Sequence, residues 1–177
     1  HIWLALTQGI PVMDRIVSVT GDVVSAPKNL LVPLGTSVRE LVEAAGGFKE
    51  EPVKVLAGGP MMGISMRSLD VPVVKGTSGI LALSSRLAVL PVESNCLRCG
   101  RCVAACPMHL IPSDLDRAVR RRDYAGFERA GGLNCIECGC CTYDCPASRC
   151  LTQTCRDGKA AVMAERRKQA QKGAQKK

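Results

Sequence analysis

Two copies of one cysteine pattern give this sequence its clearest chemical signal. Each copy reads C-x-x-C-x-x-C-x-x-x-C-P, and the copies begin at Cys96 and Cys135. A 4Fe–4S cluster has four iron corners, and each corner takes one thiolate. Three cysteines separated by two residues can surround three corners from one loop, while proline favours an extended backbone at the fourth cysteine. The repeat therefore predicts two 4Fe–4S clusters that move electrons.

The fourth cysteine of each copy is expected to serve the other cluster. In two-cluster proteins with this pattern, the last cysteine binds the cluster of the opposite copy. Such crossing would bring the clusters close together and join both halves into one unit. No side chain is then needed as a catalytic acid or base. The expected ligand sets are Cys96, Cys99, Cys102 and Cys145 for the first cluster, and Cys135, Cys138, Cys141 and Cys106 for the second.

Zinc and disulfide bonds fit this pattern less well. Zinc sites usually use two C-x-x-C pairs separated by a longer loop. Disulfides would have to pair cysteines on tight loops in a chain whose eleven cysteines are an odd number. Cys140, Cys150 and Cys155 lie outside the repeat, and we expect each to be a small buried side chain or a bystander thiol. Cys140, beside Cys141, is the alternative ligand.

Length and composition set the class of protein. At 177 residues the chain can hold one ordinary domain or two small ones. Eleven cysteines without a signal peptide favour a reducing cytosol. The longest apolar runs, residues 79–83 and 87–92, are far shorter than the roughly 18 residues of a membrane span. Any association with a membrane must therefore involve a partner or the protein surface.

The net charge of +8 is concentrated near the C-terminus. Residues 158–177 carry seven basic side chains and one acidic side chain, with almost no large apolar residue after Met163. This composition predicts a basic tail that is a frayed helix or disordered. The tail could attract anionic lipid or an acidic partner, although a solvated extension is the favoured interpretation. Nucleic-acid binding is not expected, because no aromatic stacking platform accompanies the charge.

Residues 14–92 are expected to form a small α+β domain of the β-grasp type. β-Branched and apolar runs bounded by glycine or proline predict strands at residues 15–20, 29–34, 53–57 and 80–83. Ser37 and Glu40 have the spacing of a capping box, which predicts a helix that ends at residues 46–47. Residues 1–13 resemble the end of an upstream helix, so we expect the chain to be part of a longer protein.

Residues 58–63, Gly-Gly-Pro-Met-Met-Gly, could form either a phosphate-binding loop or a tight turn. The segment lacks the Lys-Ser/Thr of a P-loop and no clear helix follows it. We therefore interpret it as a turn. Met61 and Met62 are expected to pack in the core rather than to bind a ligand.

Residues 93–157 predict an all-α dicluster domain of ferredoxin-like chemistry. Ser113 or Asp114 could cap a first helix, and residues 124–130 could form a second helical turn. Arg120, Arg121 and Arg122 are expected to form a solvated face, with docking of an acidic electron donor as the alternative use.

Four of the polar residues near the cysteines could influence the clusters. His109 is expected to be exposed or to lie near a cluster without binding it. The other three could adjust the cluster potentials or could simply be solvated; they are Arg98, Arg101 and Glu137.

The order of motifs along the chain resembles the C subunit of the Rnf electron-transport complex. The likeness rests on Thr20-Gly21-Asp22, on residues 58–63, on residues 74–77 and on the cysteine segments 95–102 and 135–139. It implies a soluble-ligand-binding β-grasp domain followed by a helical dicluster domain. It also implies a peripheral subunit on the cytoplasmic face of the cell membrane. The complex of this family couples electron exchange between ferredoxin and NAD to ion translocation.

The resemblance implies one part of a larger enzyme rather than a complete enzyme. Its partners would be the other subunits of the complex and ferredoxin. FMN and NAD(H) are expected only on the missing upstream part, because this sequence has no G-x-G-x-x-G motif. The chain alone should therefore be an electron-transfer module without a nucleotide site. No ligand is indicated for the β-grasp domain, for which a scaffold role is favoured.

Three other functions are weighed against the Rnf interpretation. Cobalamin reductase of propanediol-using microcompartments has the same domain arrangement but reduces a corrinoid. A non-enzymatic interaction module could use the clusters only as structural staples. A free-standing ferredoxin is disfavoured by the basic charge and by the attached β-grasp domain.

Overall fold

The chain divides at residue 90 into two units, which comprise residues 1–90 and 91–177. The computed structural model describes residues 2–89 and 91–174. A short helix, α1 (Ile2–Gln8), comes first. It is followed by five strands and one helix in the first unit, and by helices in the second.

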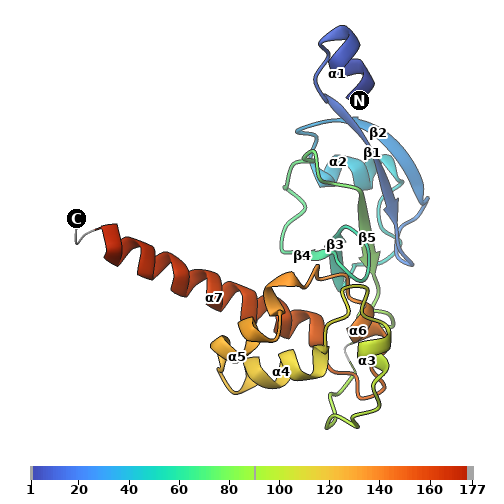
Figure 1. Cartoon of the computed structure of the whole chain (residues 1–177). Helices are drawn as coiled ribbons and strands as arrows, with labels where there is room; N and C mark the ends of the chain where they lie inside the picture. Colours follow the sequence, from blue (N-terminus) through green and yellow to red (C-terminus); the bar gives the residue numbers. More distant parts are fainter. Residues whose placement is uncertain (1, 90, 175–177) are drawn as a thin grey trace. The chain divides into compact units, whose positions relative to one another are not determined.

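A five-stranded mixed sheet is the frame of the first unit (Figure 1). The strand order is β2-β1-β5-β3-β4, in which β1 and β5 are parallel and the other neighbours are antiparallel. The strands are β1 (Asp14–Thr20), β2 (Lys28–Pro33), β3 (Lys54–Ala57), β4 (Ile64–Met66) and β5 (Gly79–Leu83). With one helix across the sheet, this is the β-grasp arrangement, and the predicted α+β class is confirmed. The short edge strand β4 was not predicted.

The helix α2 (Val38–Ala44) begins as its capping box predicts. The Ser37 hydroxyl accepts a hydrogen bond from the Glu40 backbone N–H, and the Glu40 carboxylate accepts one from the Ser37 N–H, both at 3.3 Å. These two bonds satisfy donors that the first helical turn leaves free. At the other end, Gly46 and Gly47 adopt positive φ angles, which end the helix.

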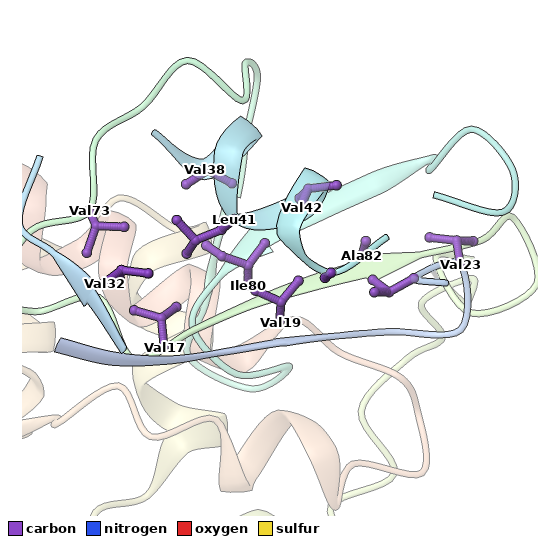
Figure 2. Close-up of a cluster of buried hydrophobic side chains, with 12 residues drawn as sticks. Val17, Val19, Val23, Val32, Val38, Leu41, Val42, Val73, Ile80 and Ala82 are labelled. Carbon is purple, nitrogen blue, oxygen red and sulfur yellow. The ribbon is translucent and has the colours of Figure 1, made fainter. Parts of the chain in front are cut away.

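The core of the first unit lies between α2 and one face of the sheet (Figure 2). Alternate residues of the strands are buried, as the two-residue period of a strand requires. The side chains that meet are Val17 and Val19 from β1, Ile80 and Ala82 from β5, and Val38, Leu41 and Val42 from α2. The close fit extends to the backbone: a Cβ atom on Gly21 would lie 1.8 Å from the Ala82 carbonyl oxygen.

Residues 58–63 form the turn between β3 and β4, as predicted. The Gly63 N–H donates to the Gly59 carbonyl oxygen at 2.8 Å, and the Gly58 N–H donates to the Gly79 carbonyl oxygen at 2.7 Å. The expectation that Met61 and Met62 pack in the core is wrong, because their exposed fractions are 42% and 53%.

The second unit contains only helices and loops among its described residues, 91–174. Helices α4, α5 and α7 pack together around Leu115, Phe127, Cys155 and Val162. The elements are α3 (Arg101–Ala104), α4 (Pro112–Arg120), α5 (Tyr124–Arg129), a 3-10 helix (Gly132–Asn134), α6 (Cys140–Tyr143) and α7 (Leu151–Ala174).

Helix α4 starts earlier than expected. Its N-cap is Ile111, not Ser113 or Asp114. Pro112 occupies the first turn, where its fixed φ angle suits a helix and its missing N–H costs nothing. Arg120 is exposed, as expected for a solvated face, and it also forms ion pairs with Asp116 and Glu93. Arg121 and Arg122 are exposed.

Helix α7 runs through the point where a separate basic tail was expected to begin. The helix continues without a break from Leu151 to Ala174. Gly158 lies inside it and is buried, and a Cβ atom there would be 2.6 Å from the Val119 side chain and 3.0 Å from the Phe127 ring. The glycine lets α7 approach α4 and α5 closely, so packing outweighs its poor helix propensity.

Candidate functional site

The eight repeat cysteines line two separate hollows in the second unit. The first hollow is lined by Cys96, Cys99, Cys102 and Cys145. The second hollow is lined by Cys106, Cys135, Cys138 and Cys141 of the repeat and also by Cys155, which lies outside the repeat. Each hollow therefore receives three cysteines from one copy of the repeat and the fourth cysteine from the other copy. These are the two sets expected from the sequence.

The backbones of the two copies explain how this exchange arises. Helices α3 and α6 contain the third cysteine of their own copy, Cys102 and Cys141, and they lie side by side (Figure 1). Each helix is only one turn long. The fourth cysteine comes two residues after it, so the adjacent helices place Cys106 and Cys145 next to the opposite loops.

The two loops repeat the same unusual backbone conformation 39 residues apart. Arg98 and Glu137 both have positive φ angles, of 54° and 59°. Gly100 and Gly139 follow with φ angles of 79° and 86° and cap α3 and α6. Left-handed residues turn the chain back on itself, which lets three cysteines face one side. Arg98 and Glu137 bear the conformational cost that a non-glycine residue has in this region.

Backbone N–H groups already point at two of the sulfur atoms in the second hollow. The Leu110 N–H donates to Cys106 Sγ, and the Glu137 N–H donates to Cys135 Sγ, both at 3.4 Å. Donors of this kind stabilise a thiolate and adjust the potential of a cluster that it binds.

Helix α7 holds the second loop through Glu137. The Glu137 carboxylate accepts hydrogen bonds from Lys159 Nζ at 2.7 Å and from Arg156 Nε at 3.0 Å. Lys159 Nζ also donates to the Cys135 carbonyl oxygen at 3.0 Å. Lys159 and Arg156 lower the pKa of Glu137. Glu137 is therefore an ion-paired residue that fixes the loop, whereas Arg98 and Arg101 are exposed.

Cys135 has an environment that favours its thiolate. A hydrogen bond from the Cys155 thiol, assisted by the Glu137 N–H and the charge of Lys159, lowers the pKa of Cys135 to about 6. The same contact with Cys135 and burial raise the pKa of Cys155, so Cys155 keeps its proton. Because metal-binding cysteines must be deprotonated, this arrangement suits Cys135 as a ligand and Cys155 as a donor.

The sequence matches two known domain families and is similar to proteins from several organisms. Residues 16–65 match the SLBB domain and residues 89–146 match the 4Fe-4S dicluster domain. The chain is 50% identical over 111 residues to the C subunit of a proton-translocating ferredoxin:NAD(+) oxidoreductase complex from Clostridium ljungdahlii, covering 63% of this chain and 24% of that protein. It is 41% identical over 164 residues to the C subunit of a Na(+)-translocating complex from Acetobacterium woodii, covering 93% of this chain and 37% of that protein.

The chain is a homologue of part of the C subunit of these ion-translocating complexes. The resemblance to the Rnf family is thus confirmed, and it extends to a relative from Methanosarcina acetivorans, which is 41% identical over 165 residues, covering 92% of this chain and 36% of that protein. The chain spans between 24% and 37% of the length of these three relatives. Within residues 2–89 and 91–174, none of the helices combines the length and the apolar character that a membrane span requires.

The donor chemistry of this Rnf homologue fits the iron–sulfur clusters of the dicluster family. Each hollow brings together four repeat cysteines, the usual ligand number and type for a 4Fe–4S cluster, and the second hollow also contains Cys155. Among the described residues, no group of three or more His, Cys, Asp or Glu side chains is arranged to hold a single metal ion. The repeat cysteines of each set line one hollow.

The three cysteines outside the repeat occupy different environments. Cys155 is buried, as expected, but its contact with Cys135 makes it more than a bystander. Cys150 is exposed, and its N–H donates to Glu93 at 2.8 Å. Cys140 is half-buried and is not among the residues that line either hollow. His109 is exposed.

One face of α7 contributes to the site without having been expected from the sequence. Thr152, Cys155 and Lys159 all reach the second loop, and their spacing of three and then four residues is that of one helical face. This spacing is visible in the sequence. It is obscured because the cysteine repeat ends at Pro146 and the basic residues after 158 predict a separate tail rather than one continuous helix.

Proposed function

We propose that this chain relays single electrons within an Rnf-type ferredoxin:NAD oxidoreductase that translocates ions. Two 4Fe–4S clusters would supply the one-electron chemistry, one at each hollow. The first would be bound by Cys96, Cys99, Cys102 and Cys145, and the second by Cys135, Cys138, Cys141 and Cys106. The observation that carries this proposal is the exchange of the fourth cysteine between the two hollows.

The role of the protein in this relay is to position the cysteine sulfurs around each cluster. The left-handed residues of each loop orient three sulfurs, and the neighbouring helices α3 and α6 deliver the fourth. Burial and N–H···S hydrogen bonds then adjust how readily each centre accepts an electron. FMN and NAD(H) would be bound outside this chain. We place the protein at the cytoplasmic face of the cell membrane, held there by other subunits of the complex.

Reversible redox cycling tests the relay directly. After anaerobic reconstitution, we expect about eight irons per chain and two centres that are reduced and reoxidised by one electron each. Iron analysis and EPR spectra recorded during stepwise reduction measure both quantities. Relay clusters must cycle reversibly, whereas structural clusters need not, so a wild-type chain whose centres do not cycle would refute the relay. A preparation that takes up zinc without colour would refute the iron–sulfur assignment.

An arginine-rich hollow beside the first cysteine set supports an acidic redox partner, for which ferredoxin is our proposal. Five arginines line it together with Cys96: Arg98, Arg117, Arg120, Arg121 and Arg149. Three of them pair with Asp114, Asp116 or Glu93. Among the described residues, no ion pair or hydrogen bond occupies the guanidinium of Arg98 or of Arg121. These two cations are available to a negatively charged surface.

Reversing one of these charges should slow electron exchange with ferredoxin. We expect Arg121→Glu to reduce the second-order rate by about fivefold at low ionic strength, because charge complementarity mainly speeds encounter. The difference should shrink as added salt screens the charges. Stopped-flow mixing with an acidic ferredoxin at several salt concentrations measures this. Arg167→Glu, the same change on an exposed part of α7, is the control; equal effects of both variants would exclude docking at this hollow.

A further inference from the structure

A buried threonine contacts one sulfur of the second hollow. Thr152, in the first turn of α7, has an exposed fraction of 7% and lines the second hollow. Its hydroxyl oxygen lies 3.7 Å from Cys141 Sγ and 2.8 Å from Thr142 Oγ1. The Thr152 backbone N–H also donates to Thr142 Oγ1, at 2.8 Å. Two hydroxyls and one sulfur therefore form a short hydrogen-bonded chain.

The number of available protons decides which group donates and which accepts in each of these hydrogen bonds. A cysteine that binds iron is a thiolate, so Cys141 Sγ has no proton and can only accept. The single hydroxyl proton of Thr152 must then be donated to Cys141. With that proton committed, the contact between the threonines requires Thr142 to donate and Thr152 to accept. Thr142 can do so with its own hydroxyl proton, while its oxygen accepts from the Thr152 N–H.

We propose that Thr152 is a positioning residue that raises the reduction potential of the second centre by donating an O–H···S hydrogen bond to Cys141, and that Thr142 aims this donor. This inference rests on the proposed electron-relay function. Reduction adds negative charge to the centre and its sulfurs. A hydroxyl dipole directed at one sulfur stabilises that charge, and it does so strongly because the site is buried.

Among the described residues, the first hollow lacks a corresponding hydrogen bond from a hydroxyl to a cysteine sulfur. In the 39-residue repeat, Cys102 corresponds to Cys141 and Val103 corresponds to Thr142. The first copy therefore has no hydroxyl at the position of Thr142 to orient a donor. Ser113 corresponds to Thr152 and lines the first hollow. Among the described residues, however, no hydrogen bond joins Ser113 to Cys102. The hydrogen bond therefore makes the two centres chemically different, although their ligands are alike.

Replacing Thr152 by valine tests the proposal, because valine keeps the shape and removes the hydroxyl. In the full chain reconstituted anaerobically, we expect Thr152→Val to shift one centre to a more negative midpoint potential. A roughly tenfold change in its reduction equilibrium corresponds to about 59 mV for a one-electron couple. The shifted centre should be the one that is lost in Cys138→Ala. EPR-monitored titration measures the potential, and the iron–sulfur stretching bands in resonance Raman spectra should become less sensitive to D2O, although the N–H···S hydrogen bonds to Cys106 and Cys135 remain.

Three further variants separate this role from a structural one. Thr152→Ser keeps the hydroxyl and should restore the wild-type potential, while Thr142→Val should produce a smaller shift of the same sign. Thr154→Val is the control, since Thr154 is also buried in α7 but its hydroxyl contacts the Cys150 carbonyl oxygen and Asp116 rather than a cysteine sulfur. Unchanged potentials in Thr152→Val, with both centres still cycling, would overturn this inference and leave the relay intact. A wild-type chain without reversible centres would overturn both.

Discussion

Replacing Cys106 by alanine should abolish the cluster at the second hollow and leave the cluster at the first hollow in place, although Cys106 belongs to the first copy of the repeat. The iron content should fall from about eight to about four per chain. Cys145→Ala should have the converse effect. The reason is that Cys106 lies with Cys135, Cys138 and Cys141, whereas Cys145 lies with the three cysteines of the first loop. Iron analysis and EPR of anaerobically reconstituted variants provide the measurement.

Double variants identify which cluster each change removes. Cys106→Ala combined with Cys138→Ala affects one centre twice, so about four irons should remain. Cys106→Ala combined with Cys99→Ala affects both centres, so almost no iron should remain. Ligation within each copy predicts the reverse of these two results. Cys150→Ala is a suitable control, because Cys150 is an exposed cysteine outside both hollows and should leave the iron content unchanged.

Local sequence signals predicted several features of the fold and the site correctly. The capping box of α2 depends only on Ser37 and Glu40, which are three residues apart. The cysteine spacing likewise fixes which three sulfurs can share a loop. Both depend on chain geometry over a few residues, which is why they could be predicted without knowledge of the tertiary structure.

The residues that local signals do not reveal act across long separations in the sequence. Thr152 meets Cys141 from a different helix, and Lys159 meets Glu137 from 22 residues away. Met61 and Met62 were expected in the core on hydrophobicity alone, but a three-residue edge strand gives their turn no partner layer to cover it. Hydrophobic character indicates that burial is favourable, while the topology decides whether a covering element exists.

A buried carboxylate joins the distant parts of the cysteine domain, and this connection also could not be seen in the sequence. Asp116 of α4 has an exposed fraction of 2%. Its two oxygens accept hydrogen bonds from Arg120 Nε at 2.8 Å and from Arg149 Nη2 at 2.6 Å. Arg149 also donates to the Ser94 carbonyl oxygen at 3.2 Å. The network thus connects the segment before the first cysteine loop, helix α4 and the segment after the second loop.

Removing this carboxylate should strongly destabilise the domain. Asp116→Ala leaves the guanidinium of Arg149, whose side chain is only 14% exposed, without its ionic partner. Removing one member of a buried ion pair costs about 3 kcal/mol of unfolding free energy, because the remaining charge stays desolvated. Burial raises the pKa of Asp116, but the hydrogen bonds from Arg120 and Arg149 outweigh it and leave the pKa below its usual value. The stabilisation is therefore present at neutral pH and is lost on acidification through that lowered pKa.

Asp114→Ala provides the matched control for this prediction. Asp114 lies on the same helix and pairs with Arg117, but the two side chains are 46% and 50% exposed. A solvated pair of this kind contributes at most about 1 kcal/mol, and its loss leaves no buried charge. Anaerobic urea unfolding at pH 7, followed by circular dichroism and by the absorbance of the clusters, compares the two variants. Similar unfolding midpoints for Asp116→Ala and Asp114→Ala would mean that Arg149 finds another partner or reaches water, and that the Asp116 network does not hold the two cysteine loops together.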